Sequence, residues 1–318
     1  MAQSRGKYIL YGGSKMIYTV TLNPSIDYVI SLDEMKVGLV NRLKTSSKFP
    51  GGKGINVSRI LNELNVSNTA LGFLGGFTGK FVNDALTRLN VQTDFVEIKE
   101  DTRINVKIHA QQETELNALG PNIDDTELAS FIDKFNQIGN GDVVVFSGSI
   151  PANLPQNLYD QIIKKIKANG AQFAVDTTGQ GLLDTLENNP IVIKPNNHEL
   201  GELFHTEVTT DADIEKYAKK LIEMGAQNVM ISMAGEGGML VSKDRVLRSF
   251  APKGKVLNSV GAGDSMLAGF VGEFNQSHDL EKAFKKGLAC GSATAFSLDI
   301  ATNKKIDEIF NEIDVFEK

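Results

Sequence analysis

The chain has 318 residues, of which 41% are hydrophobic and 23% charged, and a formal net charge of −6. This length and balance suit one large α/β core with a small appendage. The negative charge leaves no basic surplus for holding a polyanionic backbone, and no run approaches 18 uninterrupted apolar residues, so neither nucleic-acid binding nor membrane insertion is expected.

The first fifteen residues are polar and glycine-rich, and a strand-like run begins directly after Met16. We therefore expect residues 1–15 to be a tag or extension and residues 16–318 to form a single domain. The N-terminus lacks the apolar segment of a signal peptide. The single cysteine, Cys290, has no second thiol in the chain to pair with, which favours a reducing, cytoplasmic location.

Two segments, at about 27–49 and 103–117, show β-type patterns without intervening helices. We expect them to form a small β-sheet lid beside the main sheet. Asp27 follows the first strand, where an acid can hydrogen-bond sugar hydroxyls but is also common in turns.

The loop Gly-Gly-Lys-Gly-Ile-Asn at residues 51–56 precedes a predicted helix at 57–64. Gly52 permits close approach of a ligand to the backbone, Lys53 can pair with a phosphate, and Asn56 can donate to and accept from vicinal hydroxyls. A glycine-rich helix entry with a solvated lysine is the simpler reading of such a loop taken alone.

From about residue 66 onward, short β-rich runs alternate with amphipathic helical patterns, which predicts βαβ units and a parallel sheet. The predicted strands are 142–147, 172–176, 191–194 and 228–232, and the predicted helices are 154–168, 179–187 and 211–224. Ligands gather beyond the carboxyl ends of such strands. The polar strand ends Ser147, Asp176, Lys194 and Ser232 therefore mark a candidate site.

Asn196 follows the third of these strands and is expected to cap a short helix that presents Glu199 one turn later. Oxygen ligands on one helical face suit Mg2+, usually through waters. As an isolated N-x-x-E pattern, the pair is more often a cap and a solvated acid. The four histidines show no metal-ligand spacing.

The strongest local signal is Ser-Val-Gly-Ala-Gly-Asp-Ser-Met at residues 259–266, just before a helical pattern at 267–274. Glycines before a helix let backbone amides approach an anion, and the helix N-terminus adds partial positive charge. Asp264 then lies where it could accept the proton of an attacking hydroxyl. On spacing alone, a simple helix cap is equally consistent. The chain contains no Walker A loop and no G-x-G-x-x-G motif after a strand.

Taken together, these motifs resemble the ribokinase-like (PfkB) carbohydrate kinases, with the similarity running from Met16 to the C-terminal helix. The motifs lie at 21–27, 51–56, 194–199 and 259–266, in the family's order. The resemblance implies a three-layer α/β/α fold with a mostly parallel central sheet and a small β-sheet lid. The segments Thr-Leu-Asn-Pro-Ser-Ile-Asp at 21–27, Arg-Ile-Asn-Val-Lys at 103–107 and Ser-Gly-Ser-Ile-Pro at 147–151 look like the branch that phosphorylates hexose phosphates.

The resemblance implies ATP and Mg2+, with Asp264 as the catalytic base and the amides of Gly261, Ala262 and Gly263 as an anion hole. Asn196 and Glu199 would organise the metal. The implied sugar and sugar-phosphate contacts are Asp27, Gly52, Lys53, Asn56, Arg103, Asn105 and Arg42. The implied nucleotide contacts are Lys194, Asn196, Ser232, Gly235, Gly237, Gly261, Gly263 and Ser292.

The expected reaction converts fructose 1-phosphate to fructose 1,6-bisphosphate, and tagatose 6-phosphate is the alternative substrate for the same machinery. The resemblance also suggests a homodimer that packs through the lid. From another class, a catalytically inactive sugar-phosphate sensor would keep the fold. The presence of Asp264 beside its glycines argues against that alternative.

Overall fold

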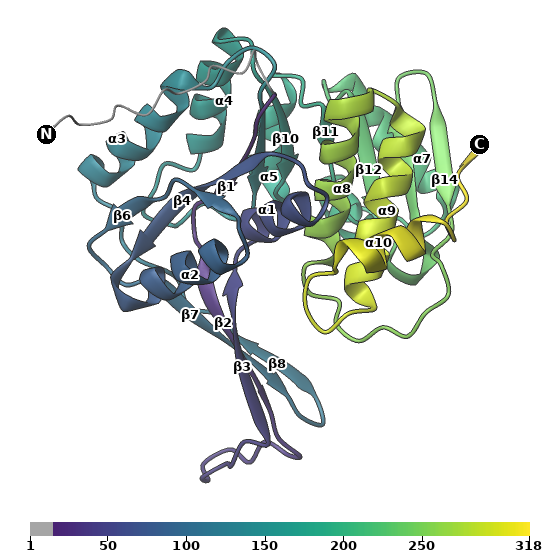
Figure 1. Cartoon of the computed structure of the whole chain (residues 1–318). Helices are drawn as coiled ribbons and strands as arrows, with labels where there is room; N and C mark the ends of the chain where they lie inside the picture. The colour runs from purple at the N-terminus through teal and green to yellow at the C-terminus, as the bar shows by residue number, and fades with distance from the viewer. Residues whose placement is uncertain (1–14) are drawn as a thin grey trace, which may run out of the picture.

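The computed structural model describes residues 15–318, which form a central sheet with helices on both faces and a smaller, separate sheet (Figure 1). This arrangement confirms the expected fold class. The expectation that residues 1–15 are a tag or extension lies, apart from Lys15, outside the described residues.

The central sheet has eleven strands in the order β15-β14-β13-β12-β11-β10-β9-β1-β4-β5, with β6 also paired to β4. Strands β12 to β4 along this path are parallel, whereas β12, β13, β14 and β15 pair antiparallel. The strands are β1 (Ile17–Thr21), β4 (Asn68–Gly75), β5 (Gln92–Thr93), β6 (Val96–Ile98), β9 (Val143–Ser147), β10 (Gln172–Asp176), β11 (Val192–Ile193), β12 (Asn228–Ser232), β13 (Gly238–Ser242), β14 (Val246–Ser249) and β15 (Phe316–Glu317).

The alternation of side chains along β9 shows how the sheet separates two cores. Val143 and Val145 pack into one buried cluster, while Val144 and Phe146 pack into the other. Because successive side chains of a strand point to opposite faces, a fully buried strand must be apolar at every position. The run of apolar residues that predicted this strand therefore reflects helices on both faces of the sheet.

The helices form the two outer layers, with α1, α8, α9 and α10 packed on one core and α3, α4, α5, α6 and α7 on the other. Helix α2 packs on a third, smaller core with β4. Their bounds are α1 (Lys53–Glu63), α2 (Gly76–Arg88), α3 (Asp125–Asp133), α4 (Leu158–Ala168), α5 (Gly179–Leu186), α6 (Asn197–Leu203), α7 (Asp211–Glu223), α8 (Ala262–Ser277), α9 (Leu280–Ala295) and α10 (Asn303–Phe310), with 3-10 turns η1 (Lys134–Gln137) and η2 (Ala234–Glu236).

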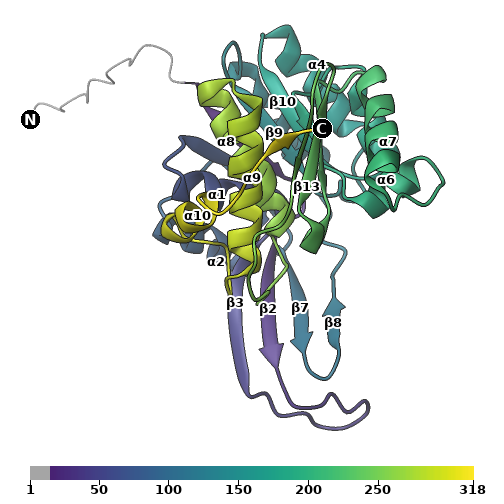
Figure 2. The same ribbon diagram turned by 90° about the vertical axis from the view of Figure 1, so that its right-hand side faces the viewer.

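The small sheet runs in the order β3-β2-β7-β8 and projects from the body of the molecule (Figures 1 and 2). Its strands are β2 (Ser25–Ser31), β3 (Thr45–Gly51), β7 (Arg103–His109) and β8 (Glu113–Leu116). β2 lies parallel to β7, and the two outer strands pair antiparallel to them. This sheet occupies the two segments expected to form a lid.

Helix starts differ most from the sequence-based expectation. Helix α1 begins at Lys53, four residues before the predicted 57, and α8 begins at Ala262 instead of 267. Both starts follow glycines with positive φ, Gly52 and Gly261, which turn the chain directly into the helix. Helix α4 begins at Leu158 instead of 154. Among the described residues, no helix combines the length and apolarity that a membrane crossing requires.

Gly72 in β4 is predicted to be essential for stability, whereas Gly181 in α5 is not. Gly72 has φ +150°, and a Cβ there would lie 2.0 Å from the Thr21 carbonyl oxygen, while a Cβ on Gly181 would meet nothing within 4 Å. We expect Gly72→Ala to lower the free energy of unfolding by about 2 kcal/mol or more. The matched Gly181→Ala change should raise it by about 0.5–1 kcal/mol. Urea unfolding of both variants measures this, and equal effects would contradict the close approach of β4 to β1.

Candidate active site

A cavity of about 550 Å³ lies between the small sheet and the N-terminus of α8, at the carboxyl ends of the central strands. It brings together most of the residues singled out from the sequence. Those lining it are Asp27, Gly52, Lys53, Asn56, Arg103, Asn105, Lys194, Asn196, Glu199, Ser232, Gly261, Gly263 and Asp264, together with Ser25, Lys107, Glu115, Asn117, Asp176 and Val260.

Asp264 lies in the first turn of α8 and is buried. The side-chain amide of Asn56 donates to its Oδ2 at 2.8 Å. Burial, and next the carboxylate of Asp176, raise the pKa of Asp264 to about 6. A carboxylate with such a pKa is a stronger base than an exposed aspartate and is still ionised near neutral pH.

Open backbone amides surround Asp264. Within residues 15–318, the N–H groups of Gly263 and Asp264 have no hydrogen-bond acceptor, as expected in the first turn of a helix. The N–H of Ala262, by contrast, donates to the Ser259 carbonyl at 3.2 Å. A Cβ on Gly263 would lie 3.1 Å from Lys194 Nζ. Because glycine has no Cβ, the ammonium group of Lys194 can lie close to the open amides. The site is suited to an anion.

Asp176 is the residue whose role the sequence did not reveal, although it was noted as a polar strand end. It is 2% exposed, and its two oxygens lie 3.6 Å from Lys53 Nζ and from Lys194 Nζ. Asp176 is the largest cause of the raised pKa of Lys53. Lys53 is therefore an ion-paired side chain in the cavity, although it remains partly exposed.

Asn196 and Glu199 form the expected cap of α6. The Asn196 side chain accepts from the Glu199 N–H, and the Glu199 carboxylate accepts from the Asn196 N–H, both at 2.8 Å. The described residues contain no group of three or more acids, histidines or cysteines that could hold a metal. The second oxygen of Glu199 and the buried Oδ2 of Asp176, which accepts no hydrogen bond although Lys53 Nζ lies 3.6 Å away, supply oxygen donors along the same cavity. This set fits Mg2+ bound largely through waters and phosphate oxygens.

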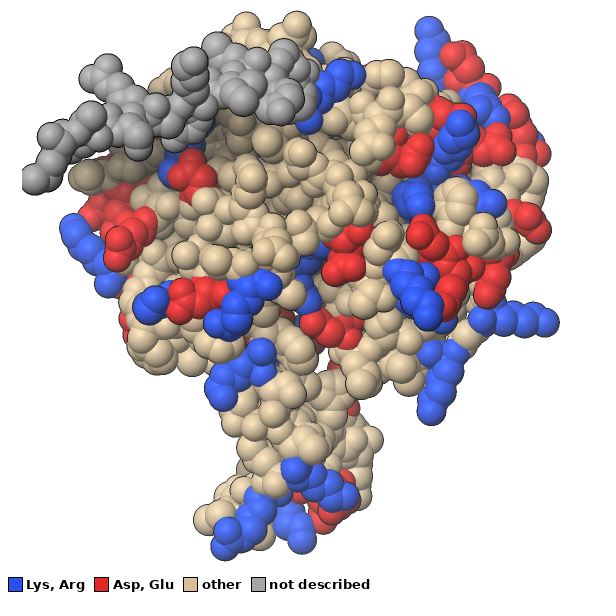
Figure 3. Space-filling model, viewed as in Figure 1, with Lys and Arg blue, Asp and Glu red and all other residues tan. Residues whose placement is uncertain are grey.

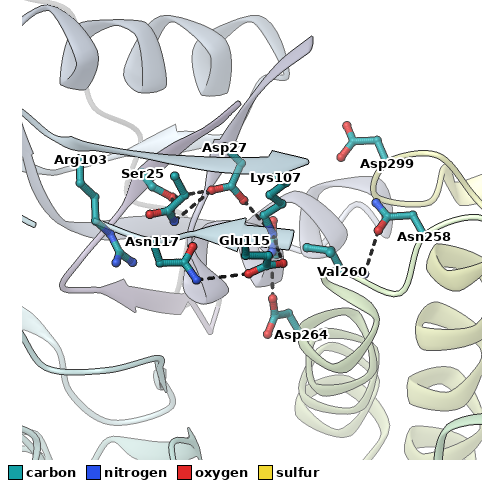
Figure 4. A network of polar contacts seen from close by, with 12 residues as sticks. Ser25, Asp27, Arg103, Lys107, Glu115, Asn117, Asn258, Val260, Asp264 and Asp299 are labelled. Atoms are coloured by element: carbon teal, nitrogen blue, oxygen red, sulfur yellow. Dashed lines mark hydrogen bonds and ion pairs between the residues drawn. The ribbon is translucent and has the colours of Figure 1, made fainter. Parts of the chain in front are cut away.

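The opposite wall of the cavity comes from alternate residues of the small sheet, whose polar contacts are drawn in Figure 4. Asp27 accepts from the Ser25 hydroxyl at 2.7 Å and from the Asn105 amide at 3.3 Å, and its other oxygen lies 3.6 Å from Lys107 Nζ. A Cβ on Gly51 would lie 2.4 Å from Asp27 Oδ1, so only glycine fits there.

Arg103 lies at the start of β7 with its guanidinium anchored by the backbone. Its two terminal nitrogens donate to the carbonyls of Ala118 at 2.8 Å and Asn23 at 2.9 Å. Burial lowers the pKa of Arg103, but an arginine remains charged at all physiological pH values. Because each terminal nitrogen carries a second N–H, the anchored fork can still donate to a ligand oxygen.

Six residues singled out from the sequence do not line this cavity: Arg42, Ser147, Gly235, Gly237, Ala262 and Ser292. Arg42 is exposed in the loop between β2 and β3, at the end of the small sheet where basic side chains gather (Figure 3). Gly235 and Gly237 belong to the turn after Ser232, and Ser292 lies on α9. Arg42 could reach a phosphate here only if its loop moved or another copy presented it.

Comparison with known proteins places most of the described chain in one family. The model of the pfkB family carbohydrate kinases matches residues 20–305. A 1-phosphofructokinase of Bacillus subtilis is 46% identical over 94% of this chain and 99% of its own length. A tagatose-6-phosphate kinase of Staphylococcus epidermidis is 34% identical, covering 95% and 100%. The crystal structure of phosphofructokinase-2 from Escherichia coli in complex with fructose-6-phosphate has a TM-score of 0.88 at 29% identity, covering 94% and 99%.

The chain belongs to the PfkB family of carbohydrate kinases. The resemblance stated from the four motifs is thereby confirmed, as is the class of reaction, transfer of a phosphoryl group from ATP to a sugar.

Asp264→Asn is expected to fold and to bind nucleotide and sugar but to lose about 10²- to 10⁴-fold in turnover, because the amide cannot accept a proton. In the wild type, turnover should fall as pH drops below about 6, where Asp264 becomes protonated. Steady-state kinetics across pH 5–9 measures both effects. Near-normal activity of the variant would exclude Asp264 as the base.

The same variant should also be more stable than the wild type at pH 8. The folded-state pKa lies above the ordinary value, so ionising Asp264 removes stability as pH rises through about 6. The variant escapes this loss, which we expect to be about 1–3 kcal/mol at pH 8 and to vanish near pH 4. Urea unfolding at the two pH values gives the comparison. An equal difference at both would mean that Asp264 is not desolvated in the folded protein.

Proposed function

We propose that this protein is a 1-phosphofructokinase, which transfers the γ-phosphoryl group of ATP to fructose 1-phosphate and forms fructose 1,6-bisphosphate and ADP. The observation that supports this most is the placement of Asp264 and open amides on one wall of a single cavity, opposite Asp27 and Arg103 on the other. The first wall suits proton removal and charge stabilisation, and the second suits a phosphorylated polyol.

In this proposal Asp264 accepts the proton of the sugar's 6-hydroxyl while that oxygen bonds to the γ-phosphorus and the bond to the ADP oxygen breaks. The N–H groups of Gly263 and Asp264, with Lys194, stabilise the charge on the transferring oxygens. Bound Mg2+, near Asn196 and Glu199, would neutralise phosphate charge. Lys53, paired with Asp176, adds positive charge on the same side of the cavity.

The sugar side of the proposal assigns one task to each side chain of the small sheet. Asp27, held by Ser25 and Asn105, accepts hydrogen bonds from sugar hydroxyls, and Asn56 and the backbone at Gly52 lie beside them. Arg103 holds the 1-phosphate through its free N–H groups. The nucleotide lies along Lys194, Asn196 and Ser232, continues past Gly235 and Gly237, and places its adenine near Ser292.

The small sheet is also the surface through which we propose that two copies associate. The loop between β2 and β3 exposes Val37 and Val40 at 90% and 89%, and the outer sheet surface exposes Ile104 and Leu116. Exposed apolar side chains gathered on one element mark association surfaces. The single buried thiol of Cys290 accords with the proposed cytoplasmic location.

The substrate assignment predicts ADP release with ATP, Mg2+ and fructose 1-phosphate in preference to fructose 6-phosphate, tagatose 6-phosphate and unphosphorylated sugars. Arg103→Gln should raise the KM for fructose 1-phosphate by roughly 10- to 100-fold, because charged hydrogen bonds to phosphate are lost, and should leave the KM for ATP unchanged. Arg88→Gln, at the end of α2 and away from the cavity, is the matched control.

Preference for tagatose 6-phosphate would transfer the assignment to the alternative substrate. Activity only with free sugars would overturn the role of Arg103, and no turnover would favour the sensor.

Sedimentation should show a dimer at micromolar concentration, which Val40→Asp converts to a monomer by placing a charge in the apolar contact. Met224→Asp makes a similar change at an exposed position after α7 and should leave the dimer intact. A monomeric wild type, or a Val40→Asp dimer, would exclude this surface.

A further inference from the structure

Arg248 in β14 is a buried cation that no part of the reaction described above uses. Its side chain is 3% exposed, and its Nε donates to Asp211 at the start of α7 at 3.0 Å. Its Nη1 donates to the carbonyls of Glu236 at 2.9 Å and Gly238 at 3.1 Å, and to that of Ser249. A buried guanidinium requires several acceptors. Here two of the four, the carbonyls of Glu236 and Gly238, belong to the turn between β12 and β13 and to the strand residue directly after it.

That turn has a backbone that needs outside support. Ala234 and Gly237 have positive φ values of 46° and 93°. A Cβ on Gly237 would lie 2.2 Å from the Ser249 carbonyl oxygen, so the turn is pressed directly against β14. In the described part of the chain, the N–H groups of Ala234 and Gly235 have no acceptor, and both residues are exposed. The turn thus combines a carbonyl held by Arg248, that of Glu236, with amides open to solvent.

One aromatic ring covers the guanidinium of Arg248, and a second ring packs on the first. The Phe250 ring lies over the guanidinium, 4.7 Å from its carbon, and Phe316 lies 5.6 Å from Phe250. Phe316 belongs to β15, which pairs with β14 so that Phe316 is opposite Arg248. The C-terminus therefore ends beside this part of the sheet (Figure 2). Shielding from solvent strengthens the hydrogen bonds that Arg248 makes.

We propose that Arg248 is a positioning residue for the nucleotide. It fixes the turn at residues 234–237 from the side away from the ligand, so that the open amides of Ala234 and Gly235 meet the nucleotide's phosphate oxygens. This inference rests on the proposed function, which assigns the turn to the nucleotide. It adds that the geometry of the turn is set by a buried cation from β14 and Asp211 of α7.

The test is Arg248→Lys, with Arg245→Lys as the matched control. Lysine keeps the charge but lacks the planar fork, so it cannot hold Asp211 and the turn carbonyls together. Arg245 is three residues away and pairs with Glu281 and Glu317 at the surface, where lysine can replace it. Arg248→Lys should raise the KM for ATP and the Kd for ADP roughly tenfold, because small misplacements of binding groups are costly. The KM for the sugar and kcat should change less than about twofold.

The outcomes distinguish a role of Arg248 in positioning the nucleotide from a role in stability alone. Equal changes in both KM values, or unchanged ADP binding by calorimetry, would overturn the proposal. If Arg248→Lys does not fold, Phe316→Ala offers a second test, because it removes only the ring that packs on Phe250. This variant should weaken ADP binding about two- to threefold and leave the KM for the sugar unchanged. Unchanged ADP binding by this variant would also overturn the proposal. ADP binding distinguishes failure of the proposed kinase activity from failure of the positioning role of Arg248. If the wild type binds ADP but phosphorylates no sugar, the proposed function is refuted. The ADP affinities of the Arg248 and Phe316 variants then still decide the role of Arg248.

Discussion

The cavity depends on one buried carboxylate. Asp176 ends a central strand, is 2% exposed, and lies between two lysines that come from different parts of the chain. A buried charge is stable only when it is paired, and its pairing in turn immobilises its partners. Asp176 therefore holds Lys53, at the start of α1, and Lys194, directly after β11, at fixed places in the cavity. Without it, two ammonium groups would repel one another in the same cavity.

The carboxylate of Asp176 also raises the pKa of Asp264, the proposed base. Asp264 is buried, and burial alone disfavours its charge, while Asp176 adds a like charge and Asn56, Lys53 and Lys194 favour ionisation. The balance leaves its pKa near 6. A much lower value would make a weak base, and a value well above 7 would leave most molecules protonated at neutral pH. In the proposed mechanism, the two lysines therefore stabilise both the charge of the phosphate and the ionised form of Asp264.

Much of this arrangement could be predicted from the sequence, because it depends on local signals. The apolar runs identified the central strands, and three of the four polar strand ends, Asp176, Lys194 and Ser232, line the cavity. Glycine-rich loops located both helix entries, although the predicted starts were late because the glycines themselves belong to the turn or helix. Tertiary contacts could not be predicted in this way. No sequence pattern links Lys53 to Asp176, shows that the Ala262 amide is occupied, or places Arg42 outside the cavity.

In the small sheet, the pairing register of β2 and β7 determines which side chains face the cavity. Ser25 and Asp27 on β2, and Arg103, Asn105 and Lys107 on β7, are all two residues apart, so their side chains share one face. Ile26 and Ile108, on the opposite face, are buried. A slip of one residue between β2 and β7 would turn Ile26 or Ile108 to the cavity face and carry the polar set to the other face, which disfavours it. The apolar face thus fixes the register, and the register places the carboxylate and the guanidinium opposite Asp264. The burial of Ile26 and Ile108 therefore helps to set the position of the groups that we propose to bind the sugar.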